Sequence, residues 1–111
     1  MARRTPGGRT ITLTSNVVVY NLYTVLAAVD TSFTLPKKCS WLQLQVDLAG
    51  GAAKVFVGDP ASLSSTDMGA VLVAGQILVI GPFESNLIRL DDIGLTSDTN
   101  TVKMEVLWVT R

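Results

Sequence analysis

A strict two-residue alternation over residues 40–48 constrains the fold most. Leu42, Leu44, Val46 and Leu48 fall on one side of an extended chain there, and Trp41, Gln43, Gln45 and Asp47 fall on the other. An antiparallel strand with one face in a core and one face outward has this pattern. No window places apolar residues at helical spacing over three turns. The sequence therefore predicts strands and no helix.

Short apolar runs recur along the chain between Gly, Pro and Asp residues. The strands expected are a period-two run from Thr10, then Val17–Val25, Phe33–Leu35, Ser40–Leu48, Ala53–Val57, Ala70–Val73, Gln76–Ile80, Asn86–Leu90 and Thr101–Val109. Gly50-Gly51 predicts a tight hairpin, and 58–69 and 91–100 are expected to be loops. This spacing predicts an all-β protein, a single antiparallel β-sandwich or jelly roll of about eight short strands.

The first nine residues differ from the rest. They contain Arg3, Arg4, Pro6, Gly7-Gly8 and Arg9, with no acidic residue. We expect them to form neither strand nor helix, so the division is an extended basic N-terminal arm at 1–9 and a β-sandwich domain at 10–111. Arginine suits forked hydrogen bonds to an acidic groove. The alternative is a solvated tail.

The composition is apolar and poor in charge. Of 111 residues, 48% are hydrophobic and only 16% are charged, whereas soluble domains average about 25% charged. Nine basic residues balance nine acidic ones, which argues against nucleic-acid binding driven by bulk charge. Because three of the basic residues lie in the arm, the remainder carries a net charge of −3. A protein surface with so few charged residues does little to prevent association with other proteins. This composition is typical of a protein that forms part of an assembly.

Residues for catalysis are sparse. The chain has no histidine, which removes the commonest general base and most zinc sites. We expect its one cysteine, Cys39, to be buried and inert, although Lys37 and Lys38 beside it would favour a thiolate. Asp91-Asp92 are expected to be solvated loop acids rather than a catalytic pair. We therefore predict no enzyme, no cofactor, no metal and no small-molecule substrate.

Trp41 lies on the outward-reading side of its strand, which is unusual for so large an apolar side chain. We expect a second packed layer or a neighbouring subunit to cover it. The alternative is that Trp41 or Tyr23 stacks on a ligand such as a sugar.

Arg3 and Arg4 before the apolar run Val17–Val29 superficially resemble a signal peptide. A polar, alternating stretch from Thr10 to Asn16 interrupts the pattern, so we expect no cleaved signal. The run is also shorter than the roughly 20 residues that span a bilayer. We expect no membrane association and synthesis in the cytoplasm.

The region 55–109 resembles small virion proteins of tailed bacteriophages. The resemblance rests on turn and strand patterns: Val55-Phe56-Val57-Gly58-Asp59, a Ser/Thr loop, Gly69 to Leu72, Ala74-Gly75-Gln76, Asn86-Leu87-Ile88-Arg89-Leu90 and Val106-Leu107-Trp108-Val109. The tyrosine usual in the asparagine-led strand is absent. The resemblance implies a capsid decoration, or cement, protein, commonly a trimeric β-sandwich that clamps major capsid subunits.

These observations predict a structural protein on the virion capsid surface, whose partners are the major capsid protein and further copies of itself. Arg3, Arg4, Pro6 and Arg9 are the expected capsid contacts, and Trp41, Gln43 and Gln45 the expected subunit contacts. The alternative is a carbohydrate- or receptor-binding β-sandwich module of a phage fibre, a tail or another assembly.

Overall fold

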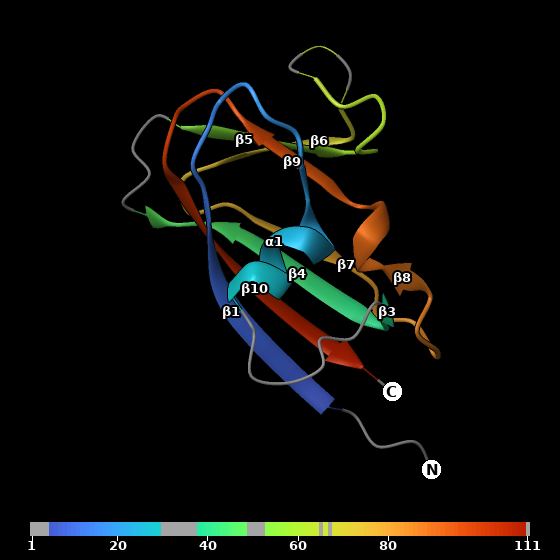
Figure 1. The fold of residues 1–111 in the computed structure, drawn as a ribbon. Coiled ribbons are helices and arrows are strands. Elements are labelled where there is room, and N and C mark those ends of the chain that lie inside the picture. Colours follow the sequence, from blue (N-terminus) through green and yellow to red (C-terminus); the bar gives the residue numbers. More distant parts are fainter. Residues whose placement is uncertain (1–4, 30–37, 49–52, 65, 67, 111) are drawn as a thin grey trace.

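Two four-stranded antiparallel sheets make up most of the protein (Figure 1). The structure, a computed structural model, describes residues 5–29, 38–48, 53–64, 66 and 68–110. Sheet A has the order β1 (Thr5–Leu13), β10 (Val102–Thr110), β4 (Trp41–Val46) and β7 (Ile77–Ile80). Sheet B has the order β2 (Tyr20–Asn21), β9 (Gly94–Ser97), β5 (Lys54–Gly58) and β6 (Ala70–Val73).

Four further short elements belong to the described fold. Strand β3 (Lys38–Cys39) pairs with β8 (Ile88–Arg89), a 3₁₀ turn (Leu90–Asp92) follows β8, and helix α1 spans Leu22–Val29. The predicted all-β class is confirmed in its coarse form, because the protein is mostly antiparallel strand with one helix.

The main pairings are nested along the chain. Strand β1 pairs with β10, β2 with β9, β4 with β7, and β5 with β6. The chain therefore doubles back once, between β5 and β6, and its two halves run side by side. The nesting places the first and last long strands next to each other in sheet A.

Side chains from both sheets form one core. On β4, Leu42, Leu44 and Val46 are fully buried, as the alternation predicts. On β10 the residues that alternate with Lys103, Glu105 and Leu107 are buried too: Val102, Met104, Val106 and Trp108. The prediction for Leu48 is wrong: β4 ends at Val46, and Leu48 is 81% exposed.

Strand β1 corrects the predicted arm. It begins at Thr5, so residues 5–9 lie in sheet A opposite β10 rather than in a free segment. Gly7 permits this, because a Cβ atom at Gly7 would lie 2.6 Å from Cζ2 and Nε1 of the buried Trp108. The glycine therefore lets the strand backbone cover the indole ring. Arg3 and Arg4 lie outside the described residues.

Helix α1 replaces the second part of the strand predicted over Val17–Val25, and only Tyr20–Asn21 of that range form a strand. The side chain of Asn21 caps the helix: its Oδ1 accepts a hydrogen bond from the Thr24 backbone N–H at 3.3 Å. Its Nδ2 donates to the Asp91 carbonyl at 2.6 Å, which fixes the helix start against the 3₁₀ turn. Leu22 and Leu26, one helical turn apart, enter the core. The prediction of no helix is therefore wrong.

Two further predictions are wrong. The stretch expected as a loop after Asp91 contains β9, an inner strand of sheet B, where Gly94 allows close approach of Pro60. Strands β4 and β5 lie in different sheets, so they do not form the predicted hairpin. Gly50-Gly51 and the strand expected over Phe33–Leu35 lie outside the described residues.

Candidate functional site

The outer face of sheet A, which points away from the core, brings the predicted subunit contacts together. Trp41, Gln43 and Gln45 are half-buried and alternate with core residues on β4. The strand register places Val109 opposite Trp41, Leu107 opposite Gln43 and Glu105 opposite Gln45 on β10, and Val79 opposite Gln43 and Ile77 opposite Gln45 on β7. Among these residues only Glu105 is charged.

Several apolar side chains on this face meet solvent. Ile77 is 52% exposed, Val79 47% and Leu107 39%. Single exposed apolar residues are ordinary, but a contiguous group across three strands marks a contact surface. The alternation that identifies Trp41 as outward-facing on β4 also places Leu107 and Val109 on the outer face of β10.

A hollow of about 510 Å³ opens on the same face. Gly8, which has no side chain, forms part of its lining with Thr10, Gln43, Glu105 and Leu107. Arg9 also lines this hollow, and its Nη1 donates to the Gly8 carbonyl at 2.7 Å. The predicted arm and the predicted subunit surface therefore meet here through Arg9 and Gln43.

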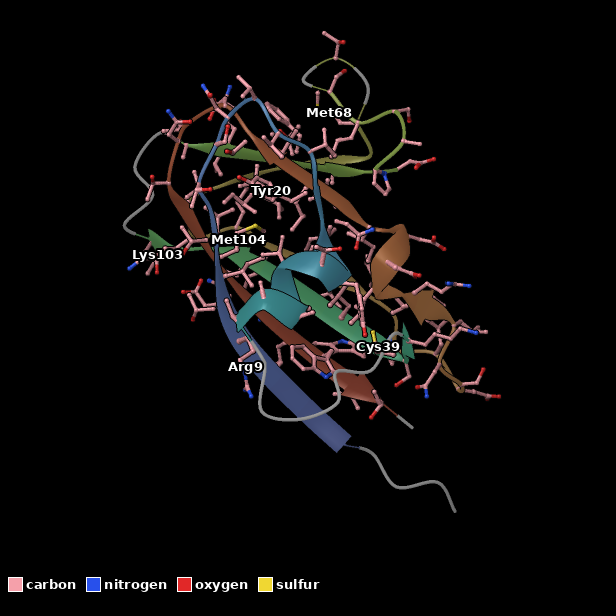
Figure 2. The ribbon with its side chains drawn as sticks, in the orientation of Figure 1. Arg9, Tyr20, Cys39, Met68, Lys103 and Met104 are labelled. Carbon is pink, nitrogen blue, oxygen red and sulfur yellow. The ribbon has the colours of Figure 1, made fainter. Side chains whose placement is uncertain are left out.

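Pro6 takes its place in the sheet through its backbone, opposite Val109. Figure 2 shows Arg9 on β1, with Lys103 farther along the same side of the molecule. Lys103 has the outward parity of Leu107 on β10, whereas Arg9 lies opposite the buried Val106 and has the parity of the core residue Ile11 on β1.

Two carboxyl groups adjoin the uncharged part of the face. The pKa of Glu105 is raised, first by burial and then by a hydrogen bond to Asp47 and the charge of Asp47, while Lys103 opposes the shift. The Asp47 backbone N–H donates to the Lys103 carbonyl at 3.0 Å, which fixes this end of β4 against β10. A raised pKa means that the proton of Glu105 is lost at a higher pH than usual, which lessens the negative charge in mildly acidic solution.

Cys39 is buried in the core, as expected from the sequence. Burial raises the pKa of its thiol to about 11, so the thiolate is scarce near neutral pH. Asp91 is not simply solvated: it forms a two-point ion pair with Arg89, at 3.0 Å and 2.8 Å. Within the described ranges, no group of three or more Cys, Asp or Glu residues is placed to hold a metal ion.

A second hollow, of about 350 Å³, lies over the outer side of sheet B. Phe56 contributes to its lining together with Val17, Val19 and Leu63, and Asp98 and other polar residues complete it. Phe56 reads as outward-facing from the sequence, yet it is buried. The outward position of Phe56 in the alternation is the feature of the sequence that indicates this hollow. The residues that complete the hollow lie far away in the sequence, so the sequence alone does not predict them.

None of the helices in the described part of the chain is long and apolar enough to cross a membrane. Comparisons with protein-family models, curated proteins and solved structures find no match to the chain.

Proposed function

We propose that the two sheets form a β-sandwich of the jelly-roll type. A jelly roll is a long antiparallel hairpin of eight strands wrapped into two facing sheets. The nested pairing, from β1 with β10 inward to β5 with β6, supports this topology, as does the core shared by both sheets.

On this fold we propose a structural virion protein that decorates the outer surface of a capsid shell and stabilises it, as a trimer. The carrying observation is the broad, mostly uncharged outer face of sheet A, with Trp41 and Leu107 on adjacent strands and Glu105 and Lys103 farther along β10. Low charge and the resemblance of residues 55–109 to phage virion proteins add support. Jelly rolls also occur in lectins, so the surface rather than the fold favours this function.

The proposed mechanism is burial rather than chemistry. Copies contact one another through the outer face of sheet A, and each stable interface buries roughly 1,000 Å² or more. Arg3 and Arg4, which precede β1, contact acidic groups on the major capsid protein, together with Arg9 on the edge strand β1. The protein is made in the host cytoplasm and ends on the capsid surface.

The test is a decoration assay with shells of the encoding phage that lack this protein. Purified wild-type protein is expected to bind to saturation, and an Arg3→Ala/Arg4→Ala variant to bind at least about tenfold more weakly because charged hydrogen bonds are lost. A Lys38→Ala variant, which removes one exposed cation from β3, is the matched control. Absence of wild-type binding would contradict the function, and equal binding of all three would contradict the role of the arginines.

Residues 5–9 should be kept in this assay. Deleting them removes half of β1, so a loss of binding would report damage to sheet A as well as loss of contacts.

The hollow over Phe56 favours a second function, a carbohydrate- or receptor-binding module. The two aromatic residues expected to stack on a sugar do not share a platform, because Trp41 lies on the outer face of sheet A and Tyr23 packs against the core. A ligand would instead contact Phe56 and Val17 beneath polar groups such as Asp98. Glycan-array binding at micromolar strength, abolished by Val17→Asp, would favour this function, and no binding would contradict it.

A further inference from the structure

Two carboxyl groups meet at one end of the outer face of sheet A, and the proposed function does not use them. Glu105 on β10 lies opposite Gln45 on β4. Asp47, directly after β4, donates its backbone N–H to the Lys103 carbonyl at 3.0 Å, so Asp47 lies opposite Lys103. Asp47 and Glu105 are therefore diagonal neighbours on adjacent chain segments, within reach of each other's side chains. A hydrogen bond joins their carboxyl groups.

A hydrogen bond between two carboxyl groups requires a proton. An ionised carboxylate only accepts hydrogen bonds, whereas a protonated carboxyl group also donates one through its O–H. The bond between Asp47 and Glu105 thus exists while the pair holds a proton. Once that proton is lost, two negative charges face each other at close range and repel. The same contact is attractive in one protonation state and repulsive in the other.

The surroundings indicate which of the two groups holds the proton. The Glu105 side chain is half-buried beside the hollow on this face, and its direct neighbours across the sheet, Thr10 and Gln45, are uncharged. The exposed Lys103 lies opposite Asp47, so its positive charge favours the ionised form of Asp47. The proton therefore resides on Glu105, whose pKa is raised, first by burial.

Few other charges act on the pair. Arg9 on β1 lines the same hollow, but it has the parity of the core residue Ile11. Strands β4 and β7 contain no charged residue. Among the described residues of the strands packed around Glu105, the charges that face it are therefore those of Asp47 and Lys103.

The pair lies where burial stops supporting β4. Val46, the last residue of β4, is fully buried, whereas Leu48 is 81% exposed. Apolar burial therefore does not hold the chain after Val46. Asp47, between them, is bonded to β10 twice, through its backbone to Lys103 and through its carboxyl group to Glu105. The side-chain bond thus ties this end of β4 to β10.

We propose that Asp47 and Glu105 share one proton and act as a pH-sensitive latch between the end of β4 and β10. With the proton in place, Lys103 balances the charge of Asp47, and the latch is closed. Loss of the proton as pH rises leaves one uncompensated negative charge, and the end of β4 separates from β10 more often. The inference does not depend on the proposed trimer, because the latch lies within one chain.

Nuclear magnetic resonance of the full chain tests both parts of this inference. The ¹³C shift of the Glu105 side-chain carboxyl group, followed from about pH 3 to about pH 8, reports where the proton is lost. The pKa of Glu105 is expected to lie above its ordinary value of 4.5. Hydrogen exchange of the Asp47 amide reports opening of the strand end. Its protection factor, which corrects for the intrinsic pH dependence of exchange, is expected to fall at least about threefold across that titration.

Two conservative variants separate the shared proton from the latch. Asp47→Asn removes the like charge and can donate a hydrogen bond to an ionised Glu105, so the pKa of Glu105 should fall below its wild-type value. Glu105→Gln supplies a permanent donor to the Asp47 carboxylate, so the Asp47 amide should stay protected throughout the pH range. Glu84→Gln, at an exposed position outside both sheets, is the matched control and should leave both measurements unchanged.

Two results would overturn the inference, provided that the spectra show all variants to be folded. If the pKa of Glu105 is the same in the wild type and in Asp47→Asn, burial alone holds the proton and it is not shared. If the wild-type Asp47 amide stays as protected at high pH as it is in Glu105→Gln, the pair does not act as a latch. Neither result depends on whether the protein self-associates, so failure of the proposed trimer is a separate outcome.

Discussion

Gly7→Ala tests whether residues 5–9 are an integral part of sheet A. The new methyl group would lie 2.6 Å from two atoms of the Trp108 ring, which is 3% exposed and has little room to move. Overpacking of this kind costs about 1–3 kcal/mol. Detachment of the strand end from the indole is the alternative way to relieve the clash. Either response lowers stability.

Gly8→Ala is the internal control for this prediction. Its methyl group would face Leu107 Cδ1 at 3.3 Å, the flexible end of an exposed side chain, so the change in stability should be within about 0.5 kcal/mol. Urea denaturation and thermal denaturation, both followed by tryptophan fluorescence, measure the two variants. Gly7→Ala is expected to melt about 4–12 °C below the wild type. Equal stability of the two variants would refute the packing of β1 on Trp108.

Three further changes test individual elements by the same denaturation assay. Asn21→Ala removes the cap of α1 and should cost about 1 kcal/mol; no loss would contradict the capping role. Thr101 has φ 62°, a left-handed conformation that strains a β-branched residue, so Thr101→Gly should stabilise the protein by roughly 1 kcal/mol. Because the pKa of Glu105 is raised in the folded state, its carboxyl group lowers stability as pH rises through and above its ordinary value of 4.5. Glu105→Gln should remove that part of the pH dependence and leave the rest.

The strand pattern of sheet A was predictable because its faces differ in polarity. Residues on β4 and β10 alternate between core and surface, so the sequence identifies Trp41, Gln43 and Gln45 as one outer row. The same parity identifies Leu107 and Val109. The alternation of residues does not predict the order of strands in a sheet. That order places β7 beside β4 and so brings Val79 to the same face.

The missed elements depend on local geometry or on distant partners. Helix α1 is one short segment of eight residues, too brief for a three-turn pattern, and its signal was the Asn21 cap followed by Leu22 and Leu26. Strand β9 is short and glycine-led, and pairing with β2 and β5 stabilises it. The sequence predicts an arm over residues 5–9 because it does not show that Trp108 lies beside Gly7. Only that contact explains why the strand needs a residue without a side chain at this position.

The central claim is that this protein functions as part of an assembly, with its uncharged surfaces covered by further copies. The mass of the wild-type protein in solution, determined by sedimentation equilibrium over a wide concentration range, tests it most directly. The account predicts a species of three times the chain mass that persists on dilution. A protein that remains monomeric and soluble at high concentration would contradict it.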